Sequence, residues 1–240
     1  MNDFYKLKIV EKKTLTPESV SIGLEIPDQL KNVFNYNPGQ FVMVEKEIDG
    51  TKLRRYYSIY SPENSEVLRL GIKLKGTDGF ARYAMHNLQT GDFLSVSKPM
   101  NDMPFILKNE PQKLLAVTIG SGITPFYSMI QTIVNKATKT KMVLVYGNHT
   151  PQKTMFYNEL KSIEKQFPQN LKIYWVFSQT DEGNFAGRIN QNVIQKVLQN
   201  EGTNFDAVYL IGPDDMKKNT AQLLKENNIE PANIHYRVYG

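Results

Sequence analysis

Hydrophobic and polar residues alternate in short segments along the N-terminal part of the chain, from Phe4 to Phe105. A period of two residues is typical of β-strands, because successive side chains point to opposite faces of a sheet. The Asp49-Gly50 pair is typical of a hairpin turn between two such strands. Six segments fit the pattern: FYKLKIVEKK, SVSIGLEI, QFVMVEKEI, KLRRYYSIYS, VLRLGIKLK and FLSVSKP. With one helical insertion, DGFARYAMHNL at residues 78–88, they predict a six-stranded antiparallel β-barrel.

The pattern changes after residues 109–111, where strongly apolar segments begin to alternate with amphipathic helical segments. Strands that are apolar on both faces, joined by amphipathic helices, are typical of a parallel sheet covered by helices on both sides. Five segments have the character of strands: KLLAVTI, MVLVYG, LKIYWVF, FDAVYLI and the terminal IHYRVYG. We therefore predict two domains, a β-barrel at residues 1–108 and an α/β domain with a five-stranded parallel sheet at residues 109–240.

Length and composition exclude several classes of protein. A chain of 240 residues is enough for two domains, and its longest apolar runs are far shorter than the roughly 18 residues of a membrane span. The start, MNDFYKLKIVEKK, lacks the order of a signal peptide. There is no cysteine for a disulfide or an iron–sulfur cluster, and the three histidines lack the spacing of metal ligands. We expect a cytoplasmic monomer with no metal site.

The net charge of +5 is spread along the chain, because lysines and acidic residues are interspersed and no run of five or six cations occurs. This distribution argues against nucleic-acid binding. A modest positive field instead suits anionic cofactors and an acidic partner protein, since it raises the rate of their encounter.

A glycine-rich stretch, IGSGITP at residues 119–125, follows the first apolar strand of the second half. Thr124 is expected as the N-cap of the next helix and Pro125 as its first residue, so that backbone N–H groups near Gly120 and Gly122 face outward. Such a helix start can bind an anion. An ordinary strand-to-helix turn remains the other reading, because the stretch is not the GxGxxG dinucleotide fingerprint.

Two more apolar strands end in glycine, in VYGNHT at residues 145–150 and LIGPDDM at residues 210–216. Ligands in open α/β sheets bind beyond the carboxyl ends of strands, so the three ends predict one crevice. Asp214 and Asp215 fall in a first helical turn and would repel a phosphate, which favours a neutral carboxamide there. Simple capping of the helix dipole explains the two aspartates equally well.

The segment RRYYSIYS, residues 54–61, carries polar groups on both faces of a predicted strand. Alternation places Arg55, Tyr57 and Ile59 on one face and Arg54, Tyr56, Ser58 and Tyr60 on the other. The segment is either an ordinary amphipathic barrel strand or a platform for a flat, polyanionic cofactor.

Taken in order along the whole chain, these motifs resemble those of the ferredoxin–NADP reductase superfamily. RYYS at 55–58 looks like the family's Arg-x-Tyr-Ser flavin motif, GSGITP like its Gly-x-Gly-x-Thr-Pro nicotinamide motif, and IGPDDM like Cys-Gly-Pro-x-x-Met. VYGNHT, FAGRI at 185–189 and the terminal IHYRVYG are most similar to flavodoxin reductases and to the reductase components of bacterial oxygenases. In the oxygenase reductases a ferredoxin domain follows; this cysteine-free chain stops at Gly240, so we expect any iron–sulfur centre to belong to another protein.

The resemblance implies a flavin-binding barrel with FAD as its cofactor. Arg55 would bind the pyrophosphate, Tyr57 would contact the isoalloxazine and ribityl chain beside Tyr56, and Ser58 would act near flavin N5, where hydride arrives. Tyr239 would cover the other flavin face until nicotinamide displaces it. The remaining flavin-binding positions, which would face ribose and pyrophosphate, are Ile72, Lys73 and the backbone of Gly79, Phe80 and Ala81.

The same resemblance implies an NAD(P)-binding α/β domain that uses NADPH or NADH as co-substrate. Ser178 is followed by Gln179 where NADPH-specific relatives tend to have an arginine, and Arg188 could substitute, so we expect both cofactors to be used with a slight preference for NADPH. The positions implied are Gly120, Gly122, Thr124, Pro125, Gly147, Asn148, Ser178, Arg188, Gly212, Pro213 and Met216.

The chain departs from the family pattern at several positions. Ile211 replaces a usual cysteine, Arg237 a glutamate of the oxygenase reductases, Ala81 a serine and His149 an arginine. The function implied is a flavin-dependent oxidoreductase that takes hydride from NAD(P)H onto FAD and passes single electrons to a flavodoxin, a ferredoxin or an oxygenase component. The alternative is a flavin-binding electron-transfer subunit or redox sensor with little turnover. The absence of the family's cysteine at position 211 and of its glutamate at position 237 would allow this alternative.

Overall fold

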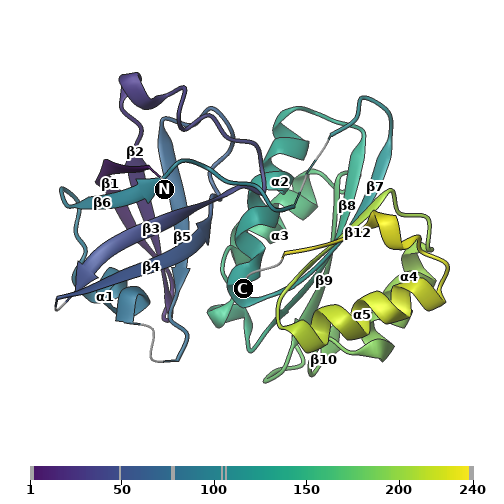
Figure 1. The fold of residues 1–240 in the computed structure, drawn as a ribbon. Helices are drawn as coiled ribbons and strands as arrows, with labels where there is room; N and C mark the ends of the chain where they lie inside the picture. The colour runs from purple at the N-terminus through teal and green to yellow at the C-terminus, as the bar shows by residue number, and fades with distance from the viewer. Residues whose placement is uncertain (1–2, 49, 77–78, 104, 106, 238–240) are drawn as a thin grey trace. The chain divides into compact units, whose positions relative to one another are not determined.

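The computed structural model describes residues 3–48, 50–76, 79–103, 105 and 107–237 (Figure 1). The chain divides into two compact units, of which the first comprises Met1–Phe105 with Thr124–Thr132 and the second comprises Ile106–Ile123 with Ile133–Gly240. The domain boundary expected between residues 108 and 109 stays a prediction. The sequence did not indicate that the helical residues 124–132 group with the first unit.

The first unit contains a six-stranded antiparallel sheet in the order β4-β3-β6-β1-β2-β5, as predicted. A bridge between Ile59 and Leu70 joins the two outermost strands, so the sheet curls into a barrel. Asp49 of the predicted hairpin lies outside the described residues, but Ile48 pairs with Thr51 on either side of it. The strands are β1 (Phe4–Thr16), β2 (Ser19–Glu25), β3 (Phe41–Ile48), β4 (Thr51–Ser58), β5 (Val67–Lys73) and β6 (Phe93–Ser97).

Helix α1 (Gly79–His86) lies within the predicted helical insertion and packs into the barrel core. Phe80, Ala81 and Ala84 are fully buried against the inward-facing aliphatic side chains of the strands. Residues 124–132 also contact this unit: Ser128 Oγ donates to the Ser61 carbonyl at 3.1 Å.

The second unit contains a parallel sheet in the order β10-β9-β8-β7-β11-β12, with six strands where the sequence predicted five. The additional strand, β10 (Phe185–Ala186), has only two residues and lies in a turn-rich stretch, so it has no period of its own. The other strands are β7 (Gln112–Ile119), β8 (Thr140–Asn148), β9 (Leu171–Phe177), β11 (Ala207–Ile211) and β12 (Ile234–Tyr236).

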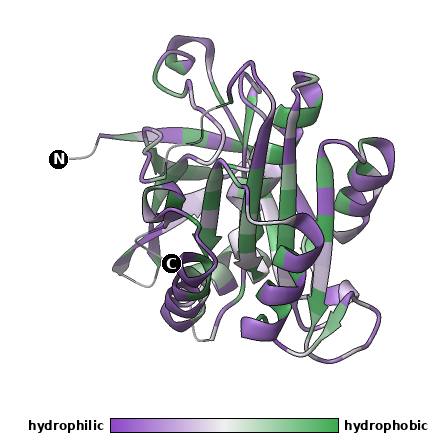
Figure 2. Cartoon of the chain, turned by 90° about the vertical axis from the view of Figure 1, so that its right-hand side faces the viewer, coloured by the Kyte–Doolittle hydropathy of each residue, from purple (hydrophilic) through white to green (hydrophobic). Residues whose placement is uncertain are grey.

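Four α-helices join these strands. Three of them, α3, α4 and α5, carry exposed polar residues beside their buried ones, whereas residues 123–130 of the first, α2, are all buried. Figure 2 shows both hydrophobic and hydrophilic residues along the helices. The central strands are almost wholly buried, which explains their near-continuous apolar sequence. Short 3₁₀ turns also occur, among them Gly120–Gly122 just before the first of the four helices. The helices are α2 (Ile123–Asn135), α3 (Tyr157–Gln166), α4 (Gln191–Glu201) and α5 (Asp214–Glu226).

Candidate cofactor-binding sites

The three glycine-terminated strands of the second unit, β7, β8 and β11, end at the same edge of the sheet. Ile119 of β7 pairs with Gly147 of β8, and Thr118 pairs with Ile211 of β11, so the strand ends are level. The turn Gly120–Gly122, the loop after Gly147 and the segment after Ile211 therefore leave the sheet side by side. This arrangement brings the three predicted glycine motifs together.

Close packing explains why glycine occupies these strand ends. A Cβ at Gly122 would overlap Thr118 Oγ1 and lie 3.0 Å from Ile211 Cγ2. At Gly147 it would lie 3.0 Å from Ile119 Cγ2, and at Gly212 it would lie 2.6 Å from Met216 Cε. At Gly122 and Gly147 the absent side chains thus let one strand end approach the next, and at Gly212 the absent side chain leaves room for Met216.

Helix α2 begins at Ile123, which corrects the expectation that Thr124 is its N-cap and Pro125 its first residue. The 3₁₀ turn continues directly into the helix, because the Ile123 N–H already donates to the Gly120 carbonyl. Thr124 and Pro125 are therefore the second and third helical residues, where a proline is tolerated because the first helical N–H groups have no partner within the helix. Gly120 has φ +54°, a conformation that favours glycine.

Tyr146 supports this turn from the neighbouring strand and was not identified from the sequence. Its fully buried hydroxyl donates to the Gly120 carbonyl at 2.9 Å, and burial raises the pKa of Tyr146 above its ordinary value. The only signal in the sequence was its place next to Gly147, which did not reveal a contact with residues 26 positions away.

The residues expected at the adenine end meet in the loops after β8 and β9. Ser178 N–H donates to the Asn148 carbonyl at 3.0 Å, and Gln179 N–H donates to the His149 carbonyl at 3.0 Å. His149 Nδ1 lies 2.9 Å from Ser178 Oγ, so His149 is hydrogen-bonded to the serine that we expect at the adenine end. Arg188 is exposed next to Ile189, whose Cδ1 lies 3.1 Å from a Cβ built at Gly147.

At the end of β11, Gly212 and Pro213 precede α5, and Asp214 and Asp215 lie in its first turn as predicted. Asp214 Oδ1 is 2.9 Å from Lys217 Nζ, and a hydrogen bond from this lysine lowers the pKa of the Asp214 carboxyl. One of the two carboxylates is thus compensated within the helix, so the repulsion expected from the pair is weaker.

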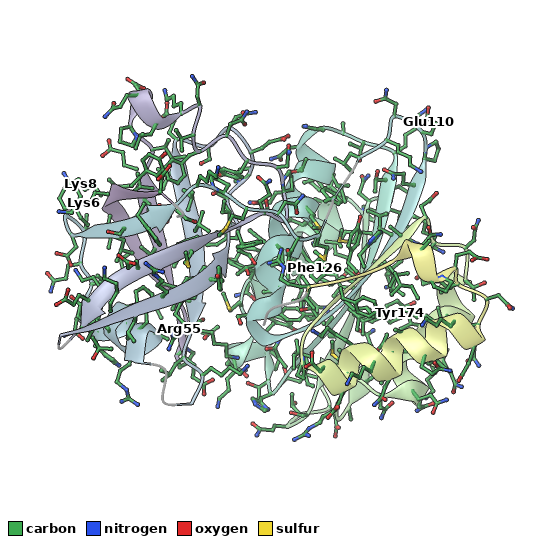
Figure 3. The ribbon with its side chains drawn as sticks, in the orientation of Figure 1. Lys6, Lys8, Arg55, Glu110, Phe126 and Tyr174 are labelled. Carbon is green, nitrogen blue, oxygen red and sulfur yellow. The ribbon has the colours of Figure 1, made fainter. Side chains whose placement is uncertain are left out.

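In the first unit, strand β4 passes beside the start of α1. The rings of Tyr57 and Phe80 are 5.7 Å apart, and a Cβ at Gly79 would lie 3.6 Å from Leu53 Cδ1. Figure 3 labels Arg55 on the part of β4 nearest α1. Arg55 Nη1 donates to the Arg54 carbonyl at 2.9 Å. The structure thereby brings Arg55, Tyr57 and Gly79 into one region.

The opposite face of β4 has a different character. Tyr56 is 49% exposed and meets the Phe41 ring edge-on at 5.8 Å. Arg54 lies over the Phe4 ring and binds Glu45 at 2.7 Å. Ser58, the last residue of β4, is half-buried opposite Phe41.

The remaining predicted flavin positions differ in what they expose. Ile72, Phe80 and Ala81 are fully buried, so their side chains fill the barrel core and only their backbone can face a ligand. Lys73 ends β5 and is half-buried. Tyr239 lies outside the described residues.

These residues fit a flat cofactor that carries phosphates. Backbone N–H groups at the start of α1 are candidate anion donors, and the first turn as described from Gly79 onward contains no acidic residue. Arg55 adds a fixed cation from the adjacent strand, and Tyr57 adds aromatic area. Across the described parts of the chain, no cluster of three or more histidine or acidic side chains could hold a metal ion, and no helix is long and apolar enough to cross a membrane.

Comparison with known proteins matches both units to characterised domains. Residues 6–105 match the oxidoreductase FAD-binding domain, and residues 117–222 match the oxidoreductase NAD-binding domain. The chain is 30% identical to the E component of 1,2-phenylacetyl-CoA epoxidase from Escherichia coli (strain K12), over 98% of this chain and 67% of that protein. It is 27% identical to the glycine betaine monooxygenase reductase subunit of Chromohalobacter salexigens, over 87% of this chain and only 57% of that protein.

A solved structure of similar size shares the fold. The ferredoxin NADP+ reductase from Neisseria gonorrhoeae with bound FAD and NADP has a TM-score of 0.80 at 18% identity, and the match covers 99% of each chain. Both domain matches, the relative at 30% identity and this fold lead to one conclusion. The chain belongs to the ferredoxin–NADP reductase superfamily of FAD- and NAD-binding oxidoreductases.

Proposed function

We propose that this oxidoreductase takes hydride from NADPH or NADH and delivers electrons one at a time to a flavodoxin, a ferredoxin or an oxygenase component. The observation that carries the proposal is the convergence of three glycine strand ends at one edge of the parallel sheet, the place where α/β sheets bind dinucleotides. FAD, when bound, supplies the conversion between a two-electron hydride and single electrons.

The residues of β4 and α1 have the chemistry to bind and orient this cofactor. Arg55 offers a planar fork of donors to the pyrophosphate, and the N–H groups of Gly79, Phe80 and Ala81 are candidates for its remaining oxygens. Tyr57 is held by its contact with Phe80, so its ring can serve as a fixed aromatic surface. The small hydroxyl of Ser58 at the strand end leaves room beside the reacting atom.

The strand-end glycines and their neighbours are the candidates for the dinucleotide. The backbone of the Gly120–Gly122 turn, to which Tyr146 is hydrogen-bonded, is the candidate for the nicotinamide half. Ser178, His149 and Arg188 are the candidates for the adenosine half, and the hydrogen bond between His149 and Ser178 supports this. Tyr239 is proposed to stack on the flavin until nicotinamide replaces it.

The identity of the electron acceptor is also a proposal. The relatives named above include a monooxygenase reductase subunit and a component of an epoxidase, which supports a partner in an oxygenase system. The net charge of +5 favours an acidic carrier protein. We propose that the chain acts as a monomer towards it.

Two measurements test this function. Flavin released from the denatured protein is expected to be FAD, and the purified protein is expected to oxidise NAD(P)H steadily with ferricyanide as acceptor. A protein that binds FAD but consumes NAD(P)H for a single turnover only would instead be the electron-transfer subunit or redox sensor. Comparing kcat/KM for NADPH and NADH at one salt concentration tests cofactor choice. We expect a ratio within about tenfold, because a contact of Arg188 with the 2′-phosphate would be partly offset by repulsion from Asp181 and Glu182.

A further inference from the structure

A basic pocket of about 440 Å³ is lined by residues of α5 and by Tyr236 and Arg237 at the end of β12. These two elements, labelled in Figure 1, are the last helix and the last strand of the second unit. The volume of the pocket is within the range of small-molecule sites. The pocket shares no lining residue with the candidate dinucleotide site, since none of the strand-end glycines, Ser178 or Arg188 lines it. Its nearest approach in sequence is Asp214, which directly follows Gly212 and Pro213. Its charged and aromatic wall consists of Asp214, Lys217, Lys218, Lys225, Tyr236 and Arg237.

The wall carries four cations and one carboxylate among its described residues, a net charge of three positive units. The carboxylate, Asp214, is already paired with Lys217 at 2.9 Å. Lys217 also donates to the Arg237 carbonyl at 3.0 Å, so α5 and the residue after β12 are joined at the pocket. The other cations of the wall are Lys218, Lys225 and Arg237.

Burial separates this pocket from an ordinary patch of surface lysines. Lys217 is 8% exposed and Arg237 is 4% exposed, although both line the pocket. Because both cations are held away from bulk water, their attraction for an anion in the pocket is screened less than it would be at the surface. Lys218 and Lys225 are exposed at the rim, where their long side chains can reach a ligand.

We propose that this pocket is a binding site for a phosphate-bearing polyanion, either an inorganic polyphosphate or the phosphate chain of a nucleotide. Arg237 and Lys217 form the floor of the site, and Lys218 and Lys225 close over the outer phosphates. Tyr236 is 38% exposed and offers an aromatic face on which a nucleobase can stack. No residue of the pocket wall is among those proposed for the dinucleotide, and the proposal does not rest on the proposed activity.

The test is a calorimetric titration of the full chain, as purified and then with FAD and NADP+ saturating, using inorganic tripolyphosphate as the probe. The double variant Lys218→Glu/Lys225→Glu is expected to weaken binding at least tenfold, because each lost charged contact is worth about a factor of ten or more. The matched control is Lys161→Glu/Lys165→Glu on α3, which makes the same charge change at exposed positions of the same unit and is expected to stay within about twofold of the parent. Thermal melts verify that both variants fold.

Four outcomes would overturn the proposal. They are no binding by the parent in the millimolar range, equal weakening in both double variants, no weakening in the Lys218/Lys225 variant, and loss of binding once NADP+ fills the dinucleotide site. ATP as a second probe distinguishes the two sources: tighter binding than tripolyphosphate identifies a nucleotide, and equal binding identifies an inorganic polyphosphate. A chain that failed to bind flavin would still give an interpretable result, since the two double variants make the same charge change and only one of them alters the pocket.

Discussion

The two candidate sites of this chain are built in different ways. In the barrel, the site depends on side chains of one strand, with Arg55 and Tyr57 beside α1 while Arg54 and Tyr56 occupy the other face. In the α/β unit, it depends on the backbone of three strand ends that glycine allows to pack closely. A side chain of the first site can be removed without disturbing its strand, whereas a change in the second site alters the packing of the sheet edge. Binding and stability should therefore be separable in the barrel and coupled in the α/β unit.

The largest effect is expected from Arg55→Ala, which removes the proposed pyrophosphate fork. FAD affinity should fall by about 1.5 to 3 kcal/mol, the value of a hydrogen bond to a charged group, which is roughly tenfold to more than a hundredfold. The stability of the flavin-free barrel, followed by circular dichroism, should barely change. Arg54→Ala is the matched control, since Arg54 points to the other face and binds Glu45; equal losses of FAD in both variants would refute the assignment.

Gly122→Ala should couple stability and binding in the α/β unit. Its Cβ would overlap Thr118 Oγ1 and crowd Ile211, so we expect a loss of about 1 to 3 kcal/mol in the free energy of unfolding and a weaker NAD(P)H interaction. Trp175, the one tryptophan of the sequence, lies on β9 and reports this unit by fluorescence.

Two further variants sharpen that result. Adding Thr118→Ala to Gly122→Ala removes one overlapping atom and should restore part of both losses. Gly79→Ala, at a roomier position of the barrel, should leave stability nearly unchanged. If Gly122→Ala weakened NAD(P)H binding with no loss of stability, the contrast between the two sites would be wrong.

A smaller effect is expected from Tyr146→Phe, which removes the hydroxyl that supports the Gly120–Gly122 turn. The lost hydrogen bond is worth about 0.5 to 1.5 kcal/mol, so KM for NAD(P)H should rise by about two- to tenfold. Tyr174, labelled in Figure 3, lies on β9, and its hydroxyl donates to Glu201 at 3.0 Å. Tyr174→Phe therefore makes the same chemical change at a position away from the glycine turn. This control should lose stability but keep its KM, and equal KM changes in both variants would contradict the role of Tyr146.

The smallest effect concerns His235, which is stacked on Tyr209 at 5.2 Å and whose pKa is lowered by burial. Because the folded state binds its proton less tightly than the unfolded state does, stability is complete above about pH 6.5 and falls as the pH drops through the lowered pKa. Trp175 fluorescence during denaturation at pH 7.5 and at about pH 5.5 should show this loss, and His235→Gln should remove it. His86→Gln, at an exposed position in the barrel unit, should still lose stability at the lower pH. If His235→Gln lost as much stability between the two pH values as the parent does, other groups would be responsible for the pH dependence.

Much of the fold could be predicted because its signals are local. Alternation along β3 and β4 and the apolar runs of β7 to β9 indicate their structure without reference to other parts of the chain. β10 was missed because two residues carry no period and form a strand only through pairing with β9. The start of α2 was misplaced because the 3₁₀ turn before it is already helical in its hydrogen bonding.

The candidate sites could be predicted only in part. Strand-end glycines are visible in the sequence because parallel strands end at a common edge, but the contact of Tyr146 with Gly120 and the hydrogen bond between His149 and Ser178 depend on tertiary packing. The same is true of Phe80 and Ala81, whose burial limits them to backbone contacts. The basic pocket beside α5 requires Arg237 to lie against a helix that begins 23 positions earlier in the chain, which no local pattern reveals.

The most direct test of the account is an anaerobic titration of the purified, FAD-loaded protein with NADPH and, separately, with NADH, followed by the visible absorbance of the flavin. We predict that both cofactors bleach the flavin with close to one equivalent, and that ferricyanide then restores its absorbance. A flavin that neither cofactor bleaches, while dithionite does, would contradict hydride transfer from NAD(P)H to FAD in this chain.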